Sequence, residues 1–261
     1  MSEPHYQGPG GGFVNPARAR LAAGEVVGAF MVAIPSVAEV QILARSGIDA
    51  LILDLEHGTI DLSTLQAMIA ATQGTGCAPL VRVPATEPWL VKPVLDAGAM
   101  GINFPLIASA AETRRAAAAL RYPPRGVRGY APSFAALRWG VEVAEYWRIA
   151  DREILNIITI ETPEAIAALD EILAVPGIDV AAIASFDLSM SLGRPGEFDH
   201  PSVRRLVAEA EAKIRQAGIV MAGVALSADA AAAKRAIGYR MLLKGFDVAM
   251  LEKTAHDAAR F

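Results

Sequence analysis

The chain has 261 residues, of which 53% are hydrophobic and 20% are charged, and this balance predicts one large soluble domain with a substantial buried core. Its formal net charge is -4 and its basic residues are scattered, which argues against nucleic-acid or membrane-surface binding and favours a small-molecule partner. The single cysteine, Cys77, excludes an internal disulfide and a CxxC metal or redox site, and it is compatible with a reducing compartment.

The start of the chain is polar and rich in Gly and Pro, so we expect a flexible leader at 1–14 and a single domain at 15–261. The leader lacks the basic end and the apolar run of a secretory signal. The apolar stretches are cut by charges, Gly or Pro before they reach the roughly 18 residues that a membrane span needs. We therefore expect a cytoplasmic protein.

After the leader, short apolar runs alternate with segments of helical periodicity almost to the end of the chain. The runs are continuously apolar, which is typical of strands buried on both faces of a parallel sheet. The predicted strands are 27–34, 50–56, 79–84, 101–107, 156–161, 180–185, 220–226 and 241–246. Between them, Ser, Asp or Thr stands at several helix starts and Gly follows many helix ends. The predicted helices are 36–47, 61–74, 87–98, 109–121, 162–174, 200–218 and 227–238.

Eight such units in about 250 residues match the size of one (β/α)8 TIM barrel. An open doubly wound sheet is the alternative, but the sequence has neither GxGxxG after a strand nor GxxxxGK[ST], which removes the usual support for its nucleotide-binding forms. The segment 122–148 is longer than an ordinary connection, and such insertions often serve a site or a subunit contact.

Unusual polar residues follow several of the predicted strands, where a barrel places its active groups. The second strand ends in D-L-E-H-G at 54–58, the third carries Arg82, the fifth ends at Glu161, and the sixth leads to Asp187. An isolated buried charge is costly. We therefore expect these groups to meet one another or an ion.

Glu161 and Asp187 are carboxylates without nearby Cys or His, a hard oxygen set that suits Mg2+, Mn2+ or Co2+. With two protein ligands, the ion would keep open positions for a bidentate 2-oxoacid and water. The alternative from spacing alone is that Glu161 caps the following helix and Asp187 opens a short turn.

His57 follows two acidic residues at a strand end, where an imidazole could act as a general base or serve a structural role. Arg82 could stabilise an enolate or bind a carboxylate, and it could also pair with Asp54 or Glu56. The remaining histidines lack a comparable position and receive no chemical role: His5, His200 and His256.

Seven short motifs occur in a fixed order along the chain. They are D-L-E-H-G at 54–58, V-R-V-P at 81–84, L-D-A-G-A at 95–99, Y-P-P-R-G-V-R-G at 122–129, I-E-T-P-E-A at 160–165, F-D-L-S at 186–189 and G-x-D at 245–247. In this order they resemble the class II pyruvate aldolases of the HpcH/HpaI aldolase/citrate lyase family, typified by 4-hydroxy-2-oxoheptanedioate aldolase. The resemblance covers nearly the whole chain after the leader.

The resemblance implies roles for individual residues. His57 would be the catalytic base, Arg82 would stabilise the transition state, and Asp96 would raise the basicity of the histidine. Glu161 and Asp187 would hold a divalent metal, Mg2+, Mn2+ or Co2+. The implied substrate-binding residues are Arg82, Thr159, Ser185, Phe186 and Asp187.

The resemblance also implies a phosphoenolpyruvate/pyruvate-type barrel and a homohexamer, a trimer of dimers that exchange their last helix. The implied reaction is the reversible cleavage of a 4-hydroxy-2-oxoacid into pyruvate, or a close analogue, and an aldehyde, in the setting of aromatic compound catabolism. The chain departs from the family pattern at Thr159, where a Gln is common, and at Ala184-Ser185, where Gly-Pro is common. Both departures put the substrate's identity in question.

Three other functions compete with this hypothesis. A related lyase or decarboxylase would act on a CoA thioester or an oxaloacetate-like acid, and a non-catalytic barrel would only bind a metabolite. A lysine-dependent aldolase would need a Schiff-base lysine on a strand, for which Lys244 is the candidate. The residues Asn103, Phe104 and those at 134–139 add bulk near an expected aldehyde site, or belong to the core or an interface.

Overall fold

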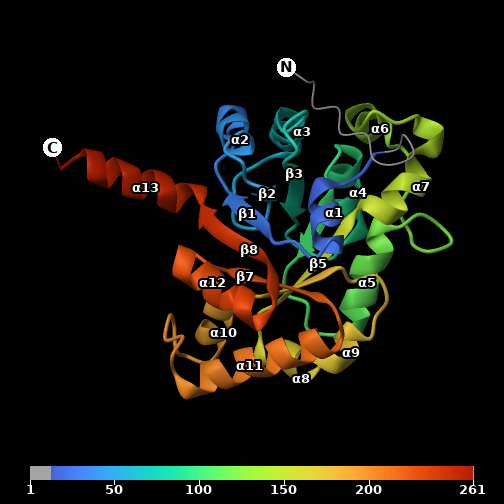
Figure 1. Ribbon diagram of the computed structural model, residues 1–261. Helices are drawn as coiled ribbons and strands as arrows, with labels where there is room; N and C mark the ends of the chain where they lie inside the picture. The colour runs from blue at the N-terminus through green and yellow to red at the C-terminus, as the bar shows by residue number, and fades with distance from the viewer. Residues whose placement is uncertain (1–12, 261) are drawn as a thin grey trace.

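In the computed structural model, which describes residues 13–260, eight parallel strands close into a barrel in chain order, and β8 pairs with β1 (Figure 1). This confirms the predicted (β/α)8 TIM barrel and rules out the open sheet. The strands are β1 Val27–Val32, β2 Ala50–Asp54, β3 Ala78–Arg82, β4 Gly101–Phe104, β5 Leu155–Ile160, β6 Val180–Ile183, β7 Val220–Val224 and β8 Tyr239–Phe246.

Helices surround the barrel, and several begin at the side-chain caps that the sequence predicts. Ser36, Asp61 and Ser109, for example, each accept the backbone N–H three residues ahead. The helices are α1 Pro16–Ala22, α2 Val37–Ala44, α3 Leu62–Ala71, α4 Pro88–Asp96, α5 Ala110–Leu120, α6 Ser133–Trp139, α7 Val143–Glu153, α8 Pro163–Ala167, α9 Leu169–Leu173, α10 Ser185–Ser191, α11 Pro201–Gln216, α12 Ala228–Ile237 and α13 Asp247–Ala258. Among the described residues, no helix is both long and apolar enough to cross a membrane.

The structure corrects some predicted boundaries. The helix predicted at 162–174 is two short helices, α8 and α9, separated at Ala168, whose ψ of 6° departs from the helical value. The segment 122–148 contains α6 and the first half of α7.

The N-terminal helix α1 is missing from the prediction, although Asn15 before Pro16 is a start signal. Of the predicted leader at 1–14, residues 1–12 lie outside the described part of the chain. Phe13 stacks on Trp139 with 4.2 Å between ring centroids, so the end of the predicted leader packs against the barrel.

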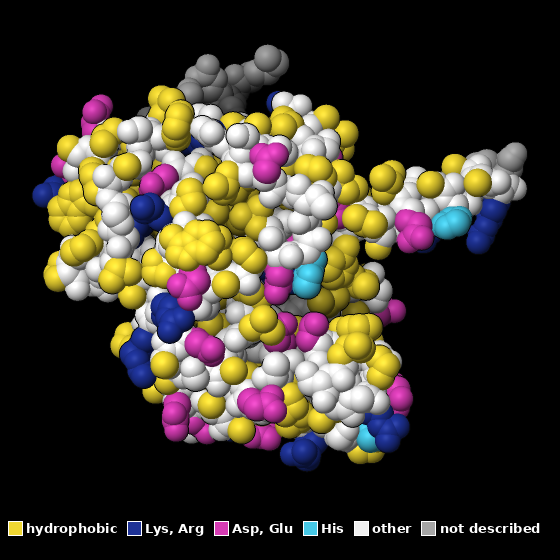
Figure 2. All heavy atoms as spheres, turned by 180° about the vertical axis from the view of Figure 1, so that it is seen from behind, with side chains coloured by type: hydrophobic (Ala, Val, Ile, Leu, Met, Phe, Trp, Pro, Cys, Tyr) yellow, Lys and Arg dark blue, Asp and Glu magenta, His cyan; other side chains and the backbone are white. Residues whose placement is uncertain are grey.

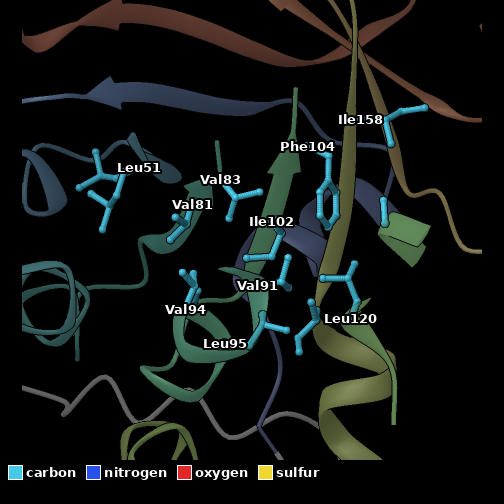
Figure 3. Packing of buried hydrophobic residues seen from close by; sticks show 14 of the residues in the cluster. Leu51, Val81, Val83, Val91, Val94, Leu95, Ile102, Phe104, Leu120 and Ile158 are labelled. Atoms are coloured by element: carbon cyan, nitrogen blue, oxygen red, sulfur yellow. The ribbon is translucent and has the colours of Figure 1, made fainter. Parts of the chain in front are cut away.

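Two hydrophobic layers result from the alternation of side chains along each strand. Leu51, Val81 and Ile102 point outward and meet helix residues such as Val94 and Leu95 of α4 (Figure 3). The opposite positions fill the barrel interior, where several are small. The interior residues include Ala29, Ala182 and Ala222 beside Ile52, Ile157 and Met241. Small residues here leave room at the mouth of the barrel.

The last helix, α13, does not fold back onto the barrel but projects from it (Figure 1). Its first residue, Asp247, is buried, and one carboxylate oxygen accepts the N–H groups of Ala33 and Ile34 at 2.7 Å each. Beyond this anchor, hydrophobic side chains lie along the projecting helix (Figure 2), and Met250 and Leu251 are exposed. The helix therefore presents an apolar surface that its own chain does not cover.

Candidate active site

A cavity of about 180 Å³ opens at the carboxyl ends of the strands. Its lower wall is apolar, and residues from the start of α10 form part of its rim. Its polar lining residues are Arg82, Asn103, Thr159, Ser185 and Asp187. The cavity thus lies where a TIM barrel places its active site.

Arg82 lies in this cavity, held from two sides by acidic residues of the turn after β2. Its Nε and Nη2 donate to the two oxygens of Asp54 at 2.9 and 2.7 Å, and Nε also lies 3.2 Å from Glu56 Oε2. Burial opposes ionisation of Asp54, but the hydrogen bond and charge of Arg82 outweigh it and hold the pKa of Asp54 below its usual value. The predicted ion pair therefore exists and fixes the guanidinium in place.

The turn that carries His57 begins where β2 ends. Asp54 Oδ1 accepts the backbone N–H groups of Glu56 and His57 at 3.0 and 3.4 Å, so the strand stops at Asp54 rather than at residue 56 as predicted. Gly58 closes the turn because a Cβ there would lie 2.2 Å from the carbonyl oxygen of Asp54. The D-L-E-H-G motif is therefore a tight turn presenting side chains at the barrel mouth.

His57 lies at the exposed rim of the site. Its side chain is 71% exposed, and Nε2 is 3.7 Å from Glu56 Oε2. Burial raises the pKa of Glu56, although the charges of Arg82 and His57 act against that shift. Glu56 therefore links the histidine to the arginine at this edge of the cavity.

Glu161 and Asp187 form the acidic side of the site. Glu161 follows β5, is 8% exposed, and accepts the backbone N–H of Leu106. Burial raises its pKa, and the nearby negative charges of Asp187 and Glu56 raise it further. Asp187 lies in the first turn of α10. These carboxylates would be stabilised by a cation between them.

Leu106, which orients Glu161, has a backbone φ of +54°, in the left-handed region that residues with a Cβ rarely adopt. Its side chain is exposed. In this conformation its backbone N–H donates to the carboxylate of Glu161.

The carboxylate pair fits a hard divalent ion by its chemistry. Carboxylate oxygens are the ligands that Mg2+ and Mn2+ prefer. Within residues 13–260, no cluster of three or more His, Cys, Asp or Glu side chains is placed to hold a metal. A site held by the two carboxylates of Glu161 and Asp187 would leave other coordination positions to substrate and water.

Three predicted substrate-binding residues, Thr159, Ser185 and Phe186, line the same cavity. Thr159 is buried and donates to Asn103 Oδ1 at 2.8 Å. Phe186 is half-exposed at the rim, 6.2 Å from the ring of Phe198. Sequence reasoning treated Asn103 only as bulk, although a polar residue inside an apolar strand is a signal for a lining position.

The structure does not bring Asp96 to His57 within one chain. Asp96 ends α4, which runs back from the cavity end of the barrel, and its carboxylate accepts from Arg128 Nη2 at 2.7 Å. Arg128 is fully buried, with its guanidinium 4.7 Å from the Tyr122 ring centroid. In this chain Asp96 therefore belongs to an ion pair at the far end of the barrel.

Lys244 does not enter the cavity. Met241 and Leu243 of β8 line it, so alternation directs Lys244 outward, where its Nζ lies beside Gly28. None of the residues that line the cavity is a lysine. The structure therefore gives no support to a Schiff-base aldolase.

Comparisons with known proteins point to one family. The family model described as HpcH/HpaI aldolase/citrate lyase matches residues 30–253. The hydroxypyruvate/pyruvate aldolase of Roseovarius nubinhibens is 37% identical over 83% of this chain and 84% of its own length. The pyruvate aldolase of Rhizobium etli is 34% identical over 95% of this chain and 98% of its own. A crystal structure of a protein of the same family from Burkholderia cenocepacia has a TM-score of 0.86 and 30% identity, and covers 95% of this chain and 98% of its own.

Proposed function

Because this chain belongs to the HpcH/HpaI aldolase/citrate lyase family, we propose that it is a divalent-metal-dependent class II aldolase. The proposed reaction is reversible cleavage of a 4-hydroxy-2-oxoacid into pyruvate, or a close 2-oxoacid, and an aldehyde. One observation carries the proposal: a fixed guanidinium and a carboxylate, Arg82 and Asp187, line one cavity, with a second carboxylate and a base candidate beside them. Glu161 is close enough to Asp187 and Arg82 to interact with their charges, and His57 is joined to Arg82 through Glu56.

Glu161 and Asp187 would hold the ion, for which Mg2+, Mn2+ and Co2+ are the candidates. A bound ion would supply Lewis acidity for the oxygens of the 2-oxoacid. Ser185 and Phe186, at the start of α10, would bind the substrate beside Asp187.

Side chains of the protein would accept the proton of the substrate and stabilise the negative charge of the enolate. His57 would accept the proton of the 4-hydroxyl as the C3–C4 bond breaks and the aldehyde carbonyl forms. The electron pair of that bond would pass to the enolate of the 2-oxoacid, and a proton added at C3 would complete the product. Asp54 and Glu56 occupy Nε and Nη2 of Arg82, so Nη1 is left to donate to the developing enolate oxygen.

Pyruvate release from a panel of 4-hydroxy-2-oxoacids tests the proposal, using metal-stripped protein with and without added Mg2+, Mn2+ or Co2+. We expect release that depends on the added ion, because chelation removes the charge that the carboxylate pair requires. Release at full rate in the presence of a chelator would contradict metal dependence. No release with any ion would favour a related lyase or a non-catalytic barrel.

We also propose that the protein is a homohexamer, a trimer of dimers that exchange α13. The support is the projecting helix, with Met250 and Leu251 exposed and its base fixed by Asp247. Removing residues 248–261 should convert the assembly to smaller species without unfolding the barrel, because few contacts join this helix to its own chain. Sedimentation velocity measures the change, and circular dichroism checks the barrel.

The matched control for this truncation is Lys253→Ala. Lys253 is an exposed residue of the same helix, paired with Asp257, and its loss should leave the sedimentation coefficient unchanged. An unchanged coefficient for the truncated protein would exclude helix exchange as the basis of assembly.

A further inference from the structure

Below the level of Glu161, most of the cavity wall is apolar, and the polar residues that the strands contribute are Arg82, Asn103 and Thr159. The guanidinium of Arg82 is already bound by Asp54 and Glu56, which leaves Asn103 and Thr159. Thr159 of β5 lies two residues before Glu161, which directly follows the strand, so alternation directs both side chains to the same face, with Thr159 one layer deeper in the barrel. Its hydroxyl donates to Oδ1 of Asn103 on the neighbouring strand β4 at 2.8 Å. The apolar residues that line the same cavity include Ala29, Ile52, Ile157, Ala182, Ala222 and Met241.

The hydrogen bond from Thr159 uses the oxygen of the Asn103 amide. The NH2 group of the same amide is left to donate to another acceptor. Asn103 is 6% exposed and lines the cavity. The residue is also well fixed, because its backbone pairs with Arg82 on one side and Ile157 on the other. An amide N–H that faces an apolar cavity is stabilised when it donates to an acceptor, and leaving it without an acceptor costs free energy.

We propose that Asn103 is a specificity-determining residue that donates a hydrogen bond from Nδ2 to an oxygen substituent on C3 of the 2-oxoacid. The inference rests on the proposed aldolase function. With the carboxylate and oxo group held at the level of Glu161 and Asp187, a C3 substituent directed down the barrel reaches the layer of Asn103 and Thr159. A hydroxyl satisfies the amide there, whereas the hydrogen of pyruvate leaves it without a partner.

The protein would discriminate between the two 2-oxoacids because pyruvate leaves the NH2 group of Asn103 without an acceptor. Sites that hydrogen-bond a substrate hydroxyl disfavour the analogue that lacks it, because the buried polar group then stays unpaired. We therefore expect the protein to prefer a 3-hydroxy-2-oxoacid over pyruvate as the nucleophilic component.

The test compares hydroxypyruvate with pyruvate in the presence of the activating ion. Proton exchange at C3 in D2O, followed by NMR, measures kcat/KM for each compound without an aldehyde. For the wild-type protein we expect the ratio of the two values to favour hydroxypyruvate about 10-fold or more. Asn103→Leu removes the donor at similar volume and should lower that ratio about 10–100-fold.

Two further variants separate the role of the Asn103 N–H donor from the role of the hydrogen bond between Thr159 and Asn103. Asn103→Asp keeps an oxygen for the Thr159 hydroxyl but has no N–H, so it should lower the ratio like Asn103→Leu. Thr159→Val removes the hydrogen bond but keeps the amide, and it should change the ratio less. Thermal unfolding confirms that each variant is folded.

An unchanged ratio in folded Asn103→Leu and Asn103→Asp would overturn the assignment to Asn103 while the aldolase proposal stands. The assignment would also be overturned if the wild-type protein had equal kcat/KM values for exchange of pyruvate and of hydroxypyruvate. No exchange of either compound by the wild-type protein with any ion would overturn the proposed function and this inference with it.

Discussion

Glu161→Gln should lower the rate of retro-aldol cleavage by about 10³-fold, because several kcal/mol of transition-state stabilisation depend on the charge at this position. The substitution is nearly isosteric, and the amide oxygen can still accept the N–H of Leu106. The local geometry is therefore retained while the negative charge shared with Asp187 is lost. Pyruvate formation measures the rate, and calorimetric titration with Mn2+ measures ion binding.

The control for Glu161 is Glu164→Gln, three residues further on in the first turn of α8. Glu164 is exposed and is not among the residues that line the cavity. Its loss should leave both the rate and the affinity for Mn2+ unchanged. If folded Glu161→Gln bound Mn2+ with the affinity of the wild-type protein, Glu161 would not be a metal ligand.

His57→Ala should lower the rate by about 10²–10⁴-fold, the range that a positioned general base contributes. Because the His57 side chain is 71% exposed, its replacement leaves a space that opens to solvent. Added imidazole should therefore restore part of the activity, with a dependence on pH that follows the added base. The rate of pyruvate formation, with and without imidazole, measures both effects.

The histidine control is His200→Asn. His200 caps α11 by accepting the N–H of Ser202, and Asn preserves that type of cap. Its rate should match the wild-type rate. Equal rates for His57→Ala and the wild-type protein would assign proton removal to another group.

The sequence predicts the barrel well because continuous apolar runs and capping residues are local signals that tertiary packing leaves intact. The end of β2 is less predictable. The sequence predicts that the strand continues through Leu55 and Glu56, but the Asp54 side chain accepts the backbone N–H groups of Glu56 and His57 and turns the chain. A side-chain hydrogen bond of this kind can compete with a strand.

Contacts between distant residues account for what the sequence leaves open in the site. The bond between Thr159 and Asn103 joins positions 56 residues apart, so neither residue reveals its partner in the sequence. Asp96 is different, because a helix that follows a barrel strand must run back. Its place at the end of α4 therefore indicates that it lies away from His57 of the same chain.

The left-handed backbone of Leu106 carries a consequence for thermostability. A non-glycine residue in this region costs on the order of 1–3 kcal/mol, and Leu106 bears that cost where its N–H orients Glu161. Selection for heat resistance alone would favour a glycine at this position, since glycine adopts the same backbone freely. The more tolerant backbone would also hold Glu161 less firmly, so gains in melting temperature here would come with slower turnover.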